Sequence, residues 1–237
     1  GAPVPRRGRI MLTSPESFKP RTKEDYAYEV LRAAILRCEL KPGERLVLDT
    51  LSAKLGISPI PMRSALQRLQ ADGFVDIIPH SGAVVSELSP ANIEQVSVVL
   101  ERLELMGFEF ACQKASDADI AALCEFVARM GIVLATGDTD RWSEMNGEFH
   151  RRVAAISENR LLIEFTGRTL DAWTRLRRWY LPDVVKQLGE AQAEHAQMVE
   201  LLGQRDLQAL ATLVVAHHER IRAMHRRAVA GLSLARS

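Results

Sequence analysis

Hydrophobic positions in the first third of the chain follow a helical period twice and then change to the composition of strands. Apolar residues recur three and four positions apart as far as Gly73, which is suited to end a helix, and β-branched residues dominate after it. The predicted elements are a helix at Leu48–Leu55, a turn at 56–58, a second helix from Pro59, and a hairpin made of 74–78, a turn at 79–82 and 83–86. This order predicts a winged helix-turn-helix, in which the hairpin is the wing.

The second helix of this motif has one face suited to a core and one suited to solvent or DNA. Ser58 is expected to cap it through its hydroxyl, and Pro59 at the first helical position loses no hydrogen bond. At about 100° per residue, the core face comprises Met62, Ala65, Leu66 and Leu69, and the other face comprises Ile60, Arg63, Ser64 and Gln67. Arg63 and Gln67 have forked donors for phosphates or purine edges, although a solvated polar face has the same composition. His80 and Gly82 at the wing tip are placed to approach the minor groove or a phosphate.

From residue 91 onward the pattern is helical, and strand composition is absent. Caps and turns divide this region into six or seven helices, at approximately 91–114, 117–135, 139–157, 159–179, 182–204 and 206–230. The pattern changes at Leu88-Ser89-Pro90, so we expect a disordered tail at 1–22, a winged helix-turn-helix domain at 23–88 and an all-helical ligand-binding and dimerisation domain at 89–237. The expected fold class is mainly α, a winged head followed by an all-α helical bundle that is large enough to hold a pocket.

Composition narrows the class of protein without changing this picture. Hydrophobic residues make up 47% of the chain and charged residues 26%, as in ordinary globular proteins. No apolar run reaches the roughly 18 residues of a transmembrane helix, so we expect a cytoplasmic protein without membrane contact. Cys38, Cys112 and Cys124 are too widely spaced to suggest a disulfide framework or a thiolate zinc site. The net charge is only +1, but residues 1–90 hold 13 Lys and Arg against 10 Asp and Glu, so the head is weakly basic.

Several segments of the head resemble the DNA-binding domain of GntR-type bacterial transcription regulators. They follow one another in family order at 39–46, 51–58, 61–69, Asp72-Gly73-Phe74-Val75 and Pro79-His80-Ser81-Gly82. The chain departs from the family at Pro59-Ile60, where many relatives have an Arg-Thr pair, and at Ser81, where an arginine often precedes the wing glycine. Both changes remove donors from the expected DNA face. The resemblance implies that Arg45, Arg63 and the wing near His80 contact operator DNA, and we place Ser58, Ser64, Gln67 and Gly82 in the same interface.

Histidines and one asparagine are the candidate ligands of the helical region. Asn146 and His150 lie four residues apart on one predicted helix and therefore share a face, while His195 and His217 lie on two other helices. Imidazole nitrogen suits Zn, Ni, Cu and Fe, and an amide oxygen from Asn146 can converge with the three rings. Spacing alone leaves open whether these side chains bind a metal or are packed and solvated groups.

A second resemblance favours the metal. The segments that carry it are Asn146-Gly147-Glu148-Phe149-His150, 159–162, Glu194-His195, and Asp206 with His217 eleven residues later. They resemble the FCD effector-binding domain of the FadR-like subgroup, where often an aspartate and three histidines hold a metal whose coordination a small organic acid completes. These roles would fall on Asn146, His150, His195 and His217. Asn146 occupies the usual aspartate position without its charge and Glu148 points nearly opposite, so a divalent ion should bind less tightly, with Zn or Ni favoured by the nitrogen ligands.

Further side chains are candidates for the effector pocket. Arg102, Arg175, Arg177 and Arg178 can clamp a carboxylate, and Trp142, Trp173 and Trp179 can wall a pocket, although solvation and ordinary packing are the simpler explanations. We select Arg102, Trp173 and Arg177 as the effector-binding set. His218, about 100° around the helix from His217, and His225, about two turns beyond it, are expected to be surface residues.

The resemblances together imply a homodimer whose two winged heads read a partly palindromic operator. We expect a repressor that a small carboxylate-type effector releases from DNA; the alternative is direct sensing of the metal ion. An enzyme is not expected, because no Glu-x-x-His pair is present and Asn146 contributes no carboxylate. A DNA-bound architectural protein with a vestigial pocket is a third hypothesis.

Overall fold

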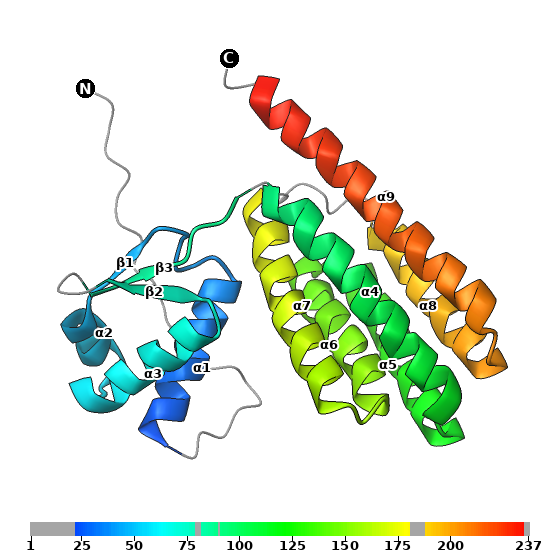
Figure 1. Cartoon of the computed structure of the whole chain (residues 1–237), viewed down its shortest axis with the longest axis horizontal. Helices are drawn as coiled ribbons and strands as arrows, with labels where there is room; N and C mark the ends of the chain where they lie inside the picture. Colours follow the sequence, from blue (N-terminus) through cyan, green and yellow to red (C-terminus); the bar gives the residue numbers. More distant parts are fainter. Residues whose placement is uncertain (1–21, 79–81, 90, 181–187, 235–237) are drawn as a thin grey trace. The chain divides into compact units, whose positions relative to one another are not determined.

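The computed structural model describes residues 22–78, 82–89, 91–180 and 188–234, and the chain divides into two compact units, Gly1–Leu88 and Ser89–Ser237 (Figure 1). The predicted tail up to residue 21 lies outside the described residues, as do His80 and Ser81 of the predicted wing tip and the side chain of His225. Each unit has a hydrophobic core of its own.

The first unit is a winged helix-turn-helix, which confirms the predicted fold. Its elements are α1 (Lys23–Leu36), β1 (Arg45–Leu46), α2 (Leu48–Leu55), α3 (Pro59–Ala71), β2 (Val75–Ile78) and β3 (Gly82–Val85). β3 lies between β1 and β2 and pairs antiparallel with both. β2 and β3 therefore form the wing, and α1 and the two-residue β1 are additional to the predicted elements.

Packing of α1 against α3 forms much of the core of this unit. Leu31, Ile35, Met62 and Leu69 are at most 1% exposed, and burial of each such side chain stabilises the fold by roughly 1.5–3 kcal/mol. On the outer side, Arg68 of α3 forms an ion pair with Asp25 of α1 at 2.8 Å. The orientation of α3 is thus fixed by apolar contacts beneath it and by an ion pair at its edge.

The turn before α3 holds one feature that the sequence analysis placed incorrectly. Gly56 ends α2 in the left-handed conformation, with φ of 65°, which suits a residue without a side chain. Ser58 precedes α3 but its side chain makes no capping hydrogen bond, so the predicted hydroxyl cap is wrong. A capping hydroxyl accepts from the amide of the second or third helical residue, and the third residue here is Pro61, which has no N–H.

The second unit is an all-α bundle, as predicted. Its helices are α4 (Ala91–Lys114), α5 (Asp117–Ala135), α6 (Thr139–Ile156), α7 (Arg160–Tyr180), α8 (Leu188–Gln204) and α9 (Leu207–Leu234). α4 contacts α6, α7, α8 and α9, so it is the central helix of the bundle. Part of the predicted start of α8, at residues 182–187, lies outside the described residues.

Caps and turns encoded in the sequence fix the ends of several helices. Ser116 and Asp119 form a reciprocal capping box at the start of α5. Arg205, in the turn between α8 and α9, donates to the carbonyl oxygens of Ala111 and Cys112 at 3.0 and 3.1 Å. Because carbonyl groups at a helix end lack partners within the helix, this arginine caps α4 and ties its end to the α8–α9 turn.

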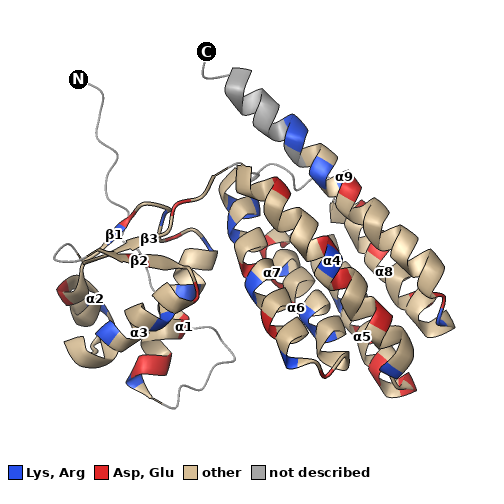
Figure 2. Ribbon diagram, in the orientation of Figure 1, with Lys and Arg blue, Asp and Glu red and all other residues tan. Residues whose placement is uncertain are grey.

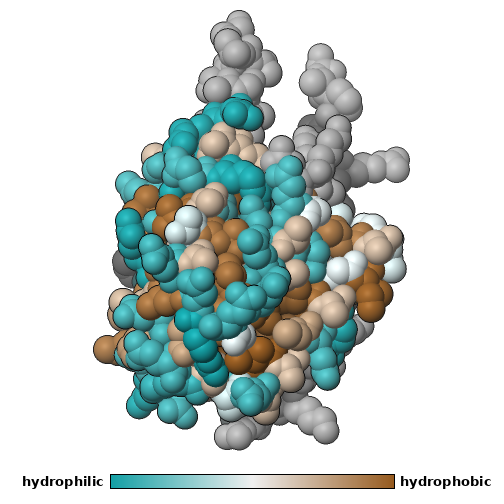
Figure 3. Space-filling view, turned by 90° about the vertical axis from the view of Figure 1, so that its right-hand side faces the viewer, coloured by the Kyte–Doolittle hydropathy of each residue, from teal (hydrophilic) through white to brown (hydrophobic). Residues whose placement is uncertain are grey.

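Basic and acidic residues are interspersed on both units (Figure 2), and the face in Figure 3 shows apolar patches between hydrophilic side chains.

Over the described part of the chain, no helix combines the length and the apolar character needed to cross a membrane. Cys38, Cys112 and Cys124 are not in disulfides, in agreement with their spacing in the sequence.

Candidate functional site

The outward face of α3 carries the polar side chains predicted to contact DNA. Arg63 and Gln67 are exposed and Ser64 is partly exposed. The opposite face is buried, since at most 5% of each residue is exposed at Met62, Ala65, Leu66 and Leu69. The helix therefore has the two faces inferred from its sequence period, and exposed Ser58 lies directly before its first turn.

Arg45 and Gly82 are exposed positions of the small sheet. Arg45 pairs with Val84 of β3, and Gly82 begins that strand with φ of 96°, a conformation that favours glycine. Within the described residues, neither Arg45 nor Arg63 forms an ion pair, whereas Arg68 is engaged by Asp25. The two unpaired guanidinium groups are thus available for phosphates or base edges.

The structure brings three of the predicted metal ligands together in the helical unit. His150 on α6, His195 on α8 and His217 on α9 each offer a ring nitrogen, and these nitrogens all lie within 4.8 Å of one another. The three residues are 4%, 0% and 3% exposed, respectively. Three different helices thus place one imidazole each at a common buried point.

His195 is the most informative of the three histidines. Neither of its ring nitrogens has a hydrogen-bond partner in the described residues, although the residue is fully buried. Burial lowers the pKa of His195 well below its usual value and that of His150 to about 4, so both rings are neutral at pH 7 and retain a lone pair. Because an unsatisfied buried polar group costs free energy, the neutral rings of His150 and His195 are suited to bind a divalent cation.

A buried carboxylate lies behind the cluster. Glu104 of α4 places Oε1 at 3.1 Å from Nδ1 of His150 and Oε2 at 2.8 Å from Nε2 of His218. Burial by itself would raise the pKa of Glu104, but the imidazoles of His150 and His218 outweigh burial and hold it at about 2. A carboxylate in this position adds negative charge near the cluster, but among the described residues Nδ1 of His150 makes no hydrogen bond to it.

The expectation that His218 is a surface residue is wrong. Its exposed fraction is 3%, because α9 packs against both α4 and α8 and a rotation of about 100° from His217 remains within the covered arc. Glu104 was not among the predicted site residues. Its burial could have been inferred from its position on the apolar stripe of α4, where Leu100, Phe108 and Ala111 are buried.

Glu194 is the carboxylate beside His217. Its carboxylate contacts Nδ1 of His217 and accepts a hydrogen bond from Nε of Arg220 at 2.9 Å. Burial opposes ionisation of Glu194, but the bonds from His217 and Arg220 outweigh it and hold the pKa of Glu194 at about 2. With Nδ1 of His217 engaged, its Nε2 is the nitrogen left for a ligand.

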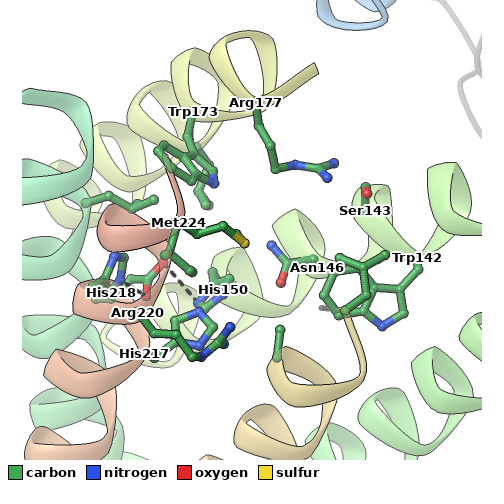
Figure 4. Close-up of a pocket in the computed structure, with 16 residues that line it drawn as sticks. Trp142, Ser143, Asn146, His150, Trp173, Arg177, His217, His218, Arg220 and Met224 are labelled. Atoms are coloured by element: carbon green, nitrogen blue, oxygen red, sulfur yellow. Dashed lines mark hydrogen bonds and ion pairs between the residues drawn. The ribbon is translucent and has the colours of Figure 1, made fainter. Parts of the chain in front are cut away.

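A cavity with a free volume of about 60 Å³ adjoins the histidines (Figure 4). Asn146 lines it together with Trp142 and Trp173, so the fourth predicted ligand faces the same cavity as His150 and His217, and the predicted pocket tryptophan Trp173 is in the wall. Arg177 reaches from α7 toward the same space in Figure 4. The cavity therefore joins a nitrogen-rich end to an arginine across largely apolar walls.

Two arginines line this cavity and differ in their partners. Arg220 is engaged by Glu194, whereas Arg177 has no carboxylate within ion-pair distance among the described residues. Burial, with a smaller contribution from neighbouring Arg178, lowers the pKa of Arg177 to about 10, so it is still a cation at pH 7. A partly buried cation without a counter-ion is complementary to an anionic ligand.

The remaining candidates for the effector pocket lie elsewhere. The structure does not bring Arg102 to the cavity: its side chain is 71% exposed beside Glu101, because residues 101 and 104 occupy the inward arc of α4. Arg178 forms an ion pair with Asp140 at 3.2 Å, and Trp179 is 39% exposed.

Trp142 connects the wall of the cavity to the cluster. Its ring stacks on that of His195 with centroids 5.9 Å apart and an interplanar angle of 27°. Its Nε1 donates a hydrogen bond to Oε1 of Gln192 at 2.8 Å, which fixes the position of the indole.

Family comparisons match both units. The model of bacterial regulatory proteins of the gntR family matches residues 23–85, and the FCD domain matches residues 95–220. The chain belongs to the GntR family. It is a DNA-binding transcription regulator with an FCD effector domain, as both resemblances indicated.

Relatives of this GntR regulator extend over most of its length. It is 30% identical over 179 residues to the Nta operon transcriptional regulator of Aminobacter aminovorans, which is 75% of this chain and 82% of that protein. It is 23% identical over 194 residues to the HTH-type transcriptional repressor RspR of Escherichia coli K12, covering 82% and 85%. Among solved structures, E. coli McbR aligns with a TM-score of 0.77 at 20% identity, over 88% of this chain and 99% of McbR. That similarity shows a shared fold.

Proposed function

We propose that this GntR regulator is a homodimeric repressor whose operator affinity falls when a small carboxylate binds beside a metal ion in the FCD domain. The observation that carries the proposal is that neither ring nitrogen of buried His195 has a hydrogen-bond partner within the described residues. The cavity beside this cluster is also lined by Arg177, which forms no ion pair with any of those residues. A nitrogen cluster at one end and a free guanidinium at the other together suit an anion that contacts both.

The proposed metal ligands are Asn146, His150, His195 and His217. Three imidazoles favour Zn or Ni over ions that prefer oxygen. When bound, the ion would supply positive charge that attracts and orients a carboxylate. Asn146 would contribute a neutral oxygen, while the carboxylates of Glu104 and Glu194 lie behind the rings of His150 and His217.

The proposed effector is a small acid. A free volume of about 60 Å³ accommodates roughly five water molecules, since one water needs about 10–15 Å³ by this measure. Arg177 would bind a carboxylate through its forked donors, and Trp173 and Trp142 would cover the apolar part of the molecule. We therefore favour acids with few carbon atoms over fatty acids or nucleotides.

On DNA, the proposed contacts are Arg45, Ser58, Arg63, Ser64, Gln67, His80 and Gly82. The exposure of α3's polar face and the absence of ion pairs at Arg45 and Arg63 among the described residues support them. Two heads related by two-fold symmetry would read two half-sites of a palindrome. The relative RspR is named as a repressor, and this agrees with repression here.

The test measures operator affinity by fluorescence anisotropy with the full-length protein, on a duplex selected from a random pool. Small mono- and dicarboxylic acids are added in the presence of Zn²⁺ or Ni²⁺, or with a chelator. We expect at least one acid to weaken DNA binding by about 5–150-fold when the metal is present. Arg177→Gln should abolish this response, whereas Arg178→Gln should retain it because Arg178 is already paired with Asp140.

Other outcomes decide between the alternatives. A large change on adding metal alone, with no further effect of any acid, would establish direct metal sensing. An affinity that responds to neither metal nor acid would overturn the proposal and leave DNA binding without an effector. The proposal requires that the ligand bind the DNA-competent and DNA-incompetent states with different affinity.

A further inference from the structure

Ile60 is the most exposed large hydrophobic side chain in the described part of the chain, at 81%. It lies in the first turn of α3, on the face that carries Arg63 and Gln67 and opposite the buried Met62. The core cluster of this unit does not include Ile60. The core of the first unit therefore does not explain an isoleucine at this position.

Exposure alone is weak evidence, because single apolar residues are common on protein surfaces. In addition, the residues around Ile60 offer few hydrogen-bond donors. Pro59 and Pro61 have no backbone N–H, and the side chain of Ser58 makes no capping bond. The start of α3 thus lacks two of the amide donors that a helix N-terminus ordinarily offers to a phosphate, and presents an aliphatic side chain instead.

The major groove of DNA contains one prominent apolar group, the 5-methyl group of thymine, and aliphatic side chains contact it. We propose that Ile60 is a specificity-determining residue that reads a thymine methyl group in each operator half-site. The flanking prolines fix the backbone on both sides of Ile60, so little conformational freedom is lost when the contact forms. The inference rests on α3 being the helix that enters the groove, and it is independent of the effector site.

The experiment removes one methyl group at a time. In the selected operator, each thymine is replaced in turn by deoxyuridine, which lacks only the 5-methyl group, and Kd is measured at one salt concentration. We expect one thymine per half-site whose replacement weakens binding by about fourfold, the effect of leaving one methyl group exposed. Substitution in both half-sites should give about the square of that factor.

Variants of the protein complete a double-mutant cycle. Ile60→Ala should bind the thymine operator less tightly and lose its sensitivity to deoxyuridine, while Ile60→Val should keep part of it. Ile132→Ala is the matched control, because Ile132 is an isoleucine of the helical unit that is 66% exposed. It should retain the full preference for thymine.

Several results would overturn the inference. One is an unchanged deoxyuridine penalty in Ile60→Ala; another is an operator in which no thymine methyl matters. If Ile60→Ala weakens binding to the thymine operator and to the deoxyuridine operator by the same factor, Ile60 is instead assigned to a contact outside the groove. Arg63→Ala tests the premise separately: loss of DNA binding in that variant supports α3 in the groove, and unchanged binding rejects the premise itself.

Discussion

Among individual residues, the partners of each buried polar group determine what the FCD cavity can bind. Nδ1 of His217 contacts Glu194, and Nδ1 of His150 lies 3.1 Å from Glu104 without a hydrogen bond. Neither ring nitrogen of His195 has a hydrogen-bond partner among the described residues. The two glutamates place negative charge behind the cluster, which partly offsets the charge that Asn146 lacks. Imidazole rings thus line one end of the cavity, with two carboxylates behind them.

Asn146→Asp should bind Zn²⁺ or Ni²⁺ roughly tenfold or more tightly than the unmodified protein, since a carboxylate adds a charge at the metal position. Competition with a chelating dye measures this affinity. Asn159→Asp is the matched control, because Oδ1 of Asn159 accepts from the amide of Leu162 at 3.2 Å and a carboxylate preserves that cap. Equal affinities in Asn146→Asp and the unmodified protein would place Asn146 outside the coordination shell.

The sequence led to the three histidines and Asn146 through the resemblance, while helical spacing shows only that Asn146 and His150 share a face. His218 was predicted to be exposed, but which arc of a helix is covered depends on how many neighbours the helix has. α9 packs against both α4 and α8, so His218, about 100° around the helix from His217, is still buried. Helical spacing does not identify which of several arginines lies in a cavity. Only the packing of the helices distinguishes Arg177, which lines the cavity, from Arg102, which does not.

At the level of elements, the helices and the wing follow from hydrophobic period and turn residues. The α3 cap failed because Ser58 matched a local rule while Pro61 removed the donor on which that rule depends. Helix α1 is held by long-range contacts with α3, and no pattern within α1 specifies them. Element type is thus predictable from local sequence, while the partners of an element are not.

The ion pair between α1 and α3 gives a pH-dependent prediction. The hydrogen bond from Arg68, followed by that from Thr22, lowers the pKa of Asp25 below 3.8. A lowered carboxyl pKa stabilises the folded state above the unfolded value and loses that contribution as the pH falls through the folded value. Asp25→Asn should lower the unfolding temperature of the first unit at pH 7, and the difference should shrink as the pH falls from 4 toward 3. Calorimetry measures both; a difference independent of pH would contradict the assignment.

A buried ion pair links α4 to α9. Glu101 and Arg222 lie 2.6 Å apart with side chains 4% and 9% exposed. Glu101→Gln should destabilise the helical unit by about 3 kcal/mol in urea unfolding, because it leaves a buried guanidinium with less compensation. Glu94→Gln breaks the exposed pair with Arg226 between the same helices and should cost less than about 1 kcal/mol. Similar losses in the two variants would show that burial is not the deciding factor.

For the whole molecule, the existence of two cores separates DNA contact from ligand contact. Arg63→Ala should weaken operator binding at least tenfold while leaving metal affinity unchanged. Arg177→Gln should have the opposite effect on operator binding: it should keep the affinity for the operator and lose the response of that affinity to acid. Anisotropy and metal titration on the same preparations check both variants. A loss of metal binding in Arg63→Ala would show that the two activities are not separable in this way.

The stack of Trp142 on His195 gives the regulator an intrinsic optical reporter. Occupation of the histidine cluster changes the electric field at the indole, so its fluorescence emission should shift or be quenched as metal is added. Trp142→Phe should remove that signal, whereas Trp179→Phe should leave it, because Trp179 is 39% exposed and does not line the cavity. Libraries of candidate inducers can therefore be screened without a dye, a label or knowledge of the promoter.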